Sequence, residues 1–130
     1  MGSFSDFWEN KVLDHLFGKA NYTPPTIYVA LSTVNPAEDG SGMAEPSDGY
    51  ARIVTAPADW TVSSGGALSN ANEIAFAEAS GNWGTITHFA LFDAISGGNF
   101  LGYGTLNTSK AVTNGDTVKF AAGDLDVTLN

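Results

Sequence analysis

The first part of the chain follows a helical period that later segments lack. Its apolar residues recur three and four positions apart, as one stripe: Phe4, Phe7, Trp8, Val12, Leu13, Leu16 and Phe17. Ser3 or Ser5 can cap a helix N-terminus, and Gly18 suits the C-terminal end. The pattern predicts an amphipathic helix within residues 1–19. Its stripe either covers an open edge or end of the same domain or docks onto a partner subunit, and both alternatives stay open.

After the prolines at positions 24 and 25 the period changes to alternation, which is typical of strands. The segment 27–32 predicts a half-buried strand, and the apolar run 85–93 predicts a central one. A glycine-rich turn at residues 96–99 joins that run to 100–106 as a hairpin. Further strands are expected at 50–55, 60–62, 72–79, 117–121 and 125–129.

Seven or eight short strands at roughly regular spacing predict a mainly β fold. We expect an antiparallel β-sandwich or barrel-like domain with one N-terminal amphipathic α-helix. The sequence shows no internal repeat and no linker, so residues 1–130 are expected to form a single domain whose β-domain spans 26–130.

A long polar segment, residues 34–49, interrupts the strand pattern and is too long for a simple connection. It contains four acidic residues, Glu38, Asp39, Glu45 and Asp48, whereas the whole chain has only five basic ones. Buried carboxylates need charged or hydrogen-bonded partners. The segment is therefore expected on the outside of the assembly, where it is mobile or meets a partner.

The balance of charge limits the partners. Fourteen acidic residues against five basic ones give a formal net charge of −9, and the basic residues form no cluster. Because nucleic-acid affinity depends on Lys and Arg neutralising phosphates, nucleic acid is excluded, and so is docking on an anionic membrane. No apolar run approaches the roughly 20 residues of a membrane span. The absence of cysteine rules out thiolate metal sites and thiol nucleophiles.

Candidate chemistry is sparse. His15 falls on the polar side of the predicted helix, and His88 lies within the central strand, where a hydrogen-bonded structural role is expected. Neither accompanies a nucleophile elbow or a zinc motif. The carboxylates of Asp124, Asp126 and the 38–48 loop fit a solvated surface, and the loop lacks EF-hand spacing. We therefore predict no catalytic residues, no cofactor and no metal, and thus no enzyme.

Glycines and aromatic residues give two further expectations. The pair at positions 102 and 104 lacks the third glycine of a dinucleotide fingerprint and marks a bulge or a close approach by another backbone. Five aromatic residues near turns either contact a partner or plug the ends of the sandwich: Tyr22, Tyr50, Trp60, Trp83 and Tyr103. With Phe4, Phe7, Trp8 and Val12 of the helix stripe, they are the candidate partner contacts.

Five segments carry a family resemblance when taken in order. They are Ser5-Asp-Phe-Trp-Glu-Asn-Lys-Val-Leu-Asp-His15, Tyr22-Thr-Pro-Pro-Thr-Ile-Tyr-Val-Ala-Leu31, Gly49-Tyr-Ala-Arg52, Trp83-Gly-Thr-Ile-Thr-His-Phe-Ala-Leu-Phe-Asp93 and the hairpin through Leu106. Together they resemble a family of small tailed-bacteriophage virion proteins, often labelled tail-fibre proteins. The resemblance implies a non-enzymatic, β-rich virion component, made in the host cytoplasm and assembled in multiple copies.

Three functions remain open at this point. A tail-fibre or tail-tip role is favoured, and capsid decoration by a cement protein is the alternative within the same class. A carbohydrate-binding module, supported only by the aromatic residues near turns, belongs to a different class. The expected partners are other virion proteins and copies of the chain itself, with a host surface glycan as a further candidate.

Overall fold

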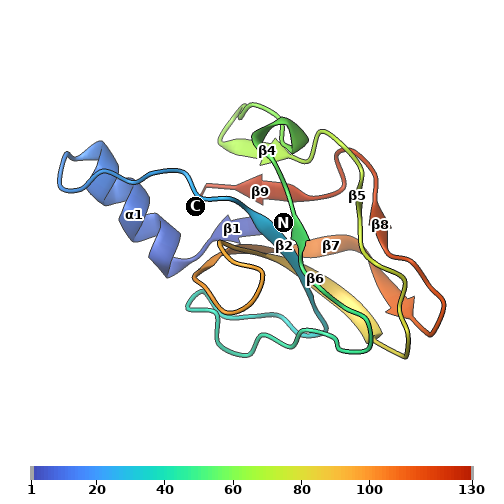
Figure 1. Cartoon of the computed structure of the whole chain (residues 1–130). Helices are drawn as coiled ribbons and strands as arrows, with labels where there is room; N and C mark the ends of the chain where they lie inside the picture. The colour runs from blue at the N-terminus through green and yellow to red at the C-terminus, as the bar shows by residue number, and fades with distance from the viewer. Residues whose placement is uncertain (1, 130) are drawn as a thin grey trace.

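The computed structural model describes residues 2–129, which form an N-terminal helix and two layers of antiparallel strands (Figure 1). In chain order the elements are β1 (Gly2–Phe4), α1 (Asp6–Leu16), β2 (Tyr28–Ser32), β3 (Ile53–Val54), a 3-10 helix (Pro57–Asp59), β4 (Ala67–Ser69), β5 (Ile74–Ala75), β6 (Gly84–Phe92), β7 (Phe100–Val112), β8 (Lys119–Phe120) and β9 (Asp126–Thr128). The predicted mainly β class with one N-terminal helix is confirmed. No helix within residues 2–129 is both long and apolar enough to span a membrane.

One layer is a five-stranded antiparallel sheet with the strand order β1-β7-β6-β2-β3. Strand β6 lies between β7 and β2, which confirms the prediction of a central strand. Its partner β7 begins at Phe100, directly after the predicted glycine turn, and extends to Val112, well beyond the expected end. The register sets Leu91 opposite Gly102 and His88 opposite Thr105.

The other layer consists of two small sheets, β4-β9 and β5-β8. The main core lies between the layers, because apolar side chains of both contribute to one buried cluster. Its members include Val29, Leu31, Phe89 and Leu91 from the large sheet and Ile74, Phe120 and Val127 from the small ones. Within the predicted strand segment 72–79, Ile74 and Phe76 are both buried.

The second face of the large sheet is covered as well, which corrects one expectation. Strand β2 was expected to be half-buried, but Val29 to Ser32 are all buried. A second cluster of Ala30, Ala90, Phe92 and Phe100 lies on this face, with Met43 packed against it. The 34–49 segment therefore packs onto this face through Met43, although most of its residues are exposed, and its place on the outside of the assembly stays a prediction. The pattern missed this packing because the residues involved are few and widely spaced among polar ones.

Element bounds also differ from the sequence prediction at the first residues. Phe4 belongs to β1 and not to the helix, and it pairs with Gly102 of β7. A Cβ atom on Gly102 would meet the carbonyl oxygen of Ser3 at 2.9 Å, which confirms the expected close approach of a backbone. The chain can thus begin as a strand because the glycine leaves room for it.

The remaining strands are shorter than predicted. Strands β3, β5 and β8 each span two residues, and β4, which the sequence analysis missed, pairs with β9. The expected strand at 60–62 is an isolated bridge between Trp60 and Asn70 that follows the 3-10 helix. In these segments side-chain hydrogen bonds replace ladder bonds. Asn70 shows this, because its amide group bonds the backbone of Asn72, Ala121 and Leu125.

Candidate functional site

Helix α1 is anchored to the large sheet at its first turn. The Ser5 hydroxyl donates a hydrogen bond to the Phe100 carbonyl at 2.6 Å and accepts one from the Trp8 backbone at 3.2 Å, so the predicted cap also fixes the helix to β7. Asp6 and Glu9 lie in the first turn, where negative charge favours the helix dipole. Of the candidate contacts on α1, Phe7, Trp8 and Val12 are half-buried.

The chain that returns from the helix is tied to it through Tyr22. The Trp8 indole donates a hydrogen bond to the Tyr22 hydroxyl at 3.1 Å, and the Tyr22 backbone donates one to Nδ1 of His15 at 3.3 Å. Burial raises the pKa of Tyr22 above its ordinary value. Tyr22 and His15 therefore brace the helix, which gives both residues a structural role.

The far end of the helix is apolar and exposed. We call Leu13, Leu16 and Phe17 the apolar tip; they are 54%, 71% and 74% exposed. Within the described helix no residue is fully buried, and α1 leads away from the two layers (Figure 1). The first half of the stripe therefore packs against its own domain, whereas the second half is exposed, and its docking onto a partner subunit stays a prediction.

An apolar groove of about 650 Å³ lies beside the base of the helix. Its lining comes from five parts of the chain and includes Phe4, Trp8, Pro24, Pro25, Ile27, Ala56, Pro57, Trp60, Leu68, Leu91, Val127 and Leu129. Leu91 is almost fully buried, whereas Leu129 is 56% exposed. Three of the candidate partner contacts, Phe4, Trp8 and Trp60, thus meet in one hollow. Sequence spacing could not show this, since β1 and the 60–68 region are brought together only by the fold.

The orientation of Trp60 in the groove is fixed by hydrogen bonds. Its indole donates to the Thr55 hydroxyl at 2.9 Å, and that hydroxyl donates to the Ile27 carbonyl at 2.8 Å. Because its polar atom is satisfied within the chain, the ring presents apolar surface to the groove. Apart from such satisfied groups the groove offers few polar atoms, so its chemistry suits an apolar partner surface.

The other candidate aromatic residues pack elsewhere. Trp83 is 5% exposed and meets the Tyr50 ring edge-on at 5.6 Å, within the main core. Tyr103 stacks on Phe100 at 5.8 Å, on the second face of the sheet. These three side chains correspond to the alternative in which aromatic residues plug the sandwich.

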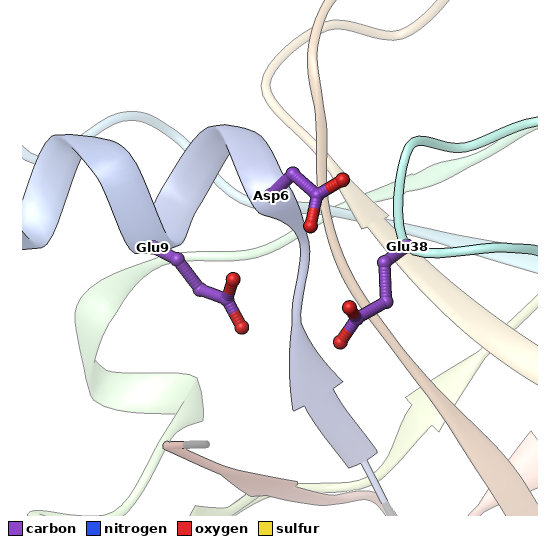
Figure 2. A group of neighbouring side chains, drawn as sticks. All are labelled: Asp6, Glu9 and Glu38. Carbon is purple, nitrogen blue, oxygen red and sulfur yellow. The ribbon is translucent and has the colours of Figure 1, made fainter.

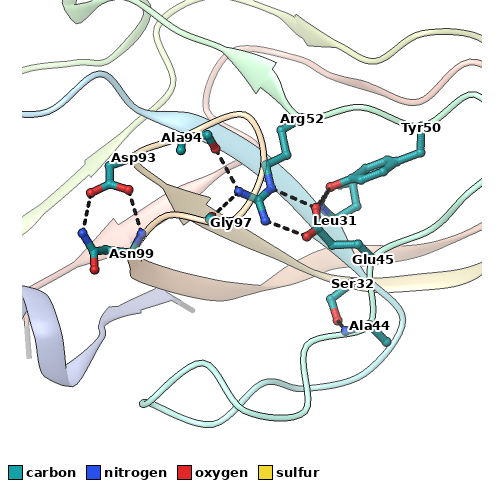
Figure 3. Close-up of polar contacts among 10 residues, drawn as sticks. All are labelled: Leu31, Ser32, Ala44, Glu45, Tyr50, Arg52, Asp93, Ala94, Gly97 and Asn99. Carbon is teal, nitrogen blue, oxygen red and sulfur yellow. Dashed lines mark hydrogen bonds and ion pairs between the residues drawn. The ribbon is translucent and has the colours of Figure 1, made fainter.

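Arg52, Glu45 and Tyr50 form a set of hydrogen-bonded side chains that we call the Arg52 network, and it connects the loops of the second face (Figure 3). The Arg52 guanidinium bonds both Glu45 carboxylate oxygens, at 2.8 and 3.0 Å, and the carbonyls of Ala94 and Gly97 at 2.8 Å. It also lies 3.6 Å from the centre of the Phe92 ring. The Arg52 side chain is only 7% exposed, so this cation is held within the monomer.

The same network perturbs two titrating groups. Burial raises the pKa of Glu45, but the hydrogen bonds from Arg52 and Tyr50 and the Arg52 charge lower it by more. The pKa of Glu45 therefore lies below its usual value. Burial, and the hydrogen bond that Tyr50 donates to Glu45, raise the pKa of the Tyr50 hydroxyl strongly. These groups hold the loops and do not face the groove, so their shifts are structural.

Three carboxylates gather beside the base of α1: Asp6, Glu9 and Glu38 (Figure 2). One oxygen of each lies within 4.8 Å of the others, and the Asp6 backbone donates to the Glu38 carbonyl at 3.0 Å. Among residues 2–129 this is the set that could offer a cation three ligands. Sequence reasoning considered Glu38 only with its own loop and missed Asp6 and Glu9, which are far from it along the chain. That no metal is needed stays a prediction.

The remaining candidates for chemistry do not converge. Nδ1 of His88 lies 2.8 Å from the Thr87 hydroxyl, in keeping with the expected structural role, and burial lowers the pKa of His88. Asp124 accepts a hydrogen bond from the Ala121 backbone at 2.9 Å and so closes a turn, while Asp126 is exposed on β9.

Comparison with protein-family models gives a match over residues 3–128 to the Gp80 family, described as podophage GP4 fiber I protein gp80. No curated protein matches the chain. The family match covers both layers of the sandwich, the helix and the groove, and it agrees with the resemblance seen in the five ordered segments. The chain therefore belongs to the Gp80 family of podophage fibre proteins and is a structural component of the phage virion.

Proposed function

We propose that the chain is a non-enzymatic subunit of the tail fibre, present in several copies on each particle and folded as a single domain. The observation that carries this proposal is the match of residues 3–128 to a phage fibre family. That match spans nearly the whole chain, so the fibre role would rest on the domain itself and not on a small part of it.

The distribution of surface chemistry supports an assembling subunit. Three exposed large apolar side chains form the apolar tip, and a fourth, Leu129, lines the groove, while Val34, Val54, Val62 and Ile95 are exposed elsewhere. Exposed apolar surface of this kind marks sites of protein interaction. The formal charge of −9 adds mutual repulsion, which keeps free subunits apart until a specific contact captures them.

The arrangement of the polar groups supports a role without catalysis. The most strongly perturbed group, Tyr50, and its partner Glu45 are occupied by hydrogen bonds within the Arg52 network. The groove itself is lined mainly by apolar side chains. A catalytic site needs an activated nucleophile or an acid–base pair that faces bound substrate. The groove lining holds the hydroxyls of Thr26, Thr55 and Ser63 but no histidine or carboxylate to activate them.

Electron cryo-microscopy of the intact particle tests the proposed position and copy number together. We expect density matching the sandwich and its projecting helix in the tail fibres, repeated in several copies. Density distributed over the capsid shell would contradict the fibre position and support a decoration protein. A single copy per particle would contradict the proposed multiplicity.

A glycan-binding assay tests the third function, a carbohydrate-binding module. The free chain is incubated with host surface polysaccharide, with Trp60→Ala as the matched variant. We expect the polysaccharide to be neither bound nor shortened by either protein. Binding that Trp60→Ala abolishes would place a glycan in the groove, and turnover of the polysaccharide would contradict a non-enzymatic role.

A further inference from the structure

We infer that the apolar groove receives the apolar tip of a second copy of the same chain. This inference rests on the proposed presence of several copies on the particle. It names the two surfaces through which those copies meet, the exposed apolar tip and the open groove, neither of which is covered by the fold of the monomer. The tip consists of Leu13, Leu16 and Phe17, and the groove is formed around Trp8, Trp60 and Leu129.

The two surfaces match in chemistry and in form. The tip projects three large apolar side chains from one end of a helix, and the groove is a hollow of about 650 Å³ with a mainly apolar lining. A helix that lays its apolar face into an apolar groove is a recurrent way for proteins to bind one another. No part of the described chain covers either surface fully, so each copy has one surface to give and one to receive.

A chain cannot fill its own groove. Trp8 lines the groove, and Phe17 lies nine residues further along the same helix, which places it about 13 Å away along the helix axis. The base of the helix is fixed by the bonds of Ser5, and its return segment is fixed through Tyr22. The tip therefore points away from its own groove and is available to a neighbour.

The charges near the two surfaces are complementary. Lys19 lies just beyond the end of α1, near the tip, whereas Asp6, Glu9 and Glu38 cluster beside the base of the helix (Figure 2). None of these three carboxylates has an ion pair within residues 2–129. A tip entering a neighbour's groove would bring Lys19 of one copy toward the acidic cluster of the next.

The area that a stable contact needs favours a closed assembly. Stable interfaces bury about 800 Å² on each partner, and one Phe side chain supplies only about 150–250 Å². A single tip is therefore too small to hold two copies together. In a closed assembly each copy gives one tip and receives another, which doubles the area buried on each copy.

Cysteine crosslinking tests the contact directly, because the native chain has no cysteine. Full-length Phe17→Cys is mixed with full-length Ser63→Cys, whose residue lines the groove, and the mixture is treated with a short thiol crosslinker. We expect dimers that contain one copy of each variant. The matched control replaces Ser63→Cys by Ile95→Cys, which is 62% exposed but lies outside the groove, and should give no such mixed dimer.

Light scattering on a second pair of variants measures the assembly itself. Leu16→Asp combined with Phe17→Asp should reduce the mass of the wild-type assembly to that of a monomer, while Ile95→Asp should leave it unchanged. Crosslinked dimers made only of two Phe17→Cys copies, or a wild type that is monomeric at all concentrations, would overturn the inference.

The failure of this inference can be told apart from the failure of the proposed function. If cryo-microscopy places the chain in the fibre but no mixed dimer forms, this inference alone is contradicted. If the mixed dimer forms but the chain lies on the capsid, only the proposed fibre position is contradicted.

Discussion

The Arg52 network and the helix end differ in which kind of side chain is buried and which is exposed. In the Arg52 network a nearly buried guanidinium bonds the Glu45 carboxylate and two backbone carbonyls, and within the described chain no buried side-chain polar atom lacks a partner. At the helix end the apolar tip and the rim of the groove are left open. Charged groups here stabilise the monomer, whereas exposed apolar groups are available for assembly. This reverses the usual expectation that charges face outward and apolar residues face inward.

The largest expected effect comes from breaking the Arg52 network. Arg52→Met leaves the Glu45 carboxylate without its partner, and we expect the free energy of unfolding to fall by about 3 kcal/mol, the low end for a broken buried pair because Glu45 is partly exposed. Urea unfolding measures this loss. The control Lys119→Met removes an exposed cation and should change stability by less than about 0.5 kcal/mol. A loss below about 1 kcal/mol in Arg52→Met would show that the loops are held by other contacts.

A smaller loss of stability is expected at the base of the helix. Trp8 is half-buried, contacts the Phe4 ring at 4.6 Å and bonds Tyr22. Trp8→Ala should cost about 2 kcal/mol, less than the full range for a buried Trp. Trp8→Phe keeps an aromatic ring but loses the hydrogen bond and a part of the indole packing, so it should cost about 1 kcal/mol. Equal losses for both variants would mean that the hydrogen bond, not the packing of the ring, holds the helix.

The Arg52 network should also make stability depend on pH. The pKa of Glu45 lies below its ordinary value of 4.5 in the folded chain, so its contribution is fully present above that value and is lost as the pH falls through the folded pKa. Burial lowers the pKa of His88 from 6.5, so its contribution to stability is present above pH 6.5 and is lost as the pH falls through its folded pKa. Urea unfolding from pH 7 to pH 3 should show a shallower acid decline for Glu45→Gln than for the wild type below pH 4.5. Parallel curves would remove Glu45 from the acid response.

The smallest change in stability is expected at the apolar tip. Leu16 is 71% exposed, so Leu16→Ala should alter the free energy of unfolding by no more than about 0.5 kcal/mol. The same variant should nevertheless weaken assembly, which sedimentation equilibrium measures. A loss of stability near that of Trp8→Ala would show that the tip packs against its own chain.

Much of the fold could be predicted from local pattern. The helix, its Ser5 cap, the central strand and the glycine-turn hairpin follow from spacing and turn chemistry within a few residues. The close approach at Gly102 could also be predicted, because a glycine within a strand has few other uses.

What could not be predicted depends on contacts between distant segments. The covering of β2 on both faces needs Met43, which stands alone in a polar loop. The burial of Arg52 depends on carbonyls of the 93–99 loop, more than 40 residues away. The groove likewise joins β1, Trp60 and β9, and no periodicity connects these segments. The sequence therefore indicated the aromatic candidates but not which of them face one hollow.

Hydroxyl-radical footprinting of the free chain and of intact phage compares the two regions in one experiment. In the free chain, diluted until it is monomeric, we expect oxidation of Leu16, Phe17 and Trp60, and also of Ile95 in the loop beside the Arg52 network. In the particle, oxidation of the first three residues should fall several-fold while Ile95 stays as reactive as before. Equal reactivity of the helix end in both samples, or protection confined to Ile95, would contradict the assignment of the helix end as the assembly surface.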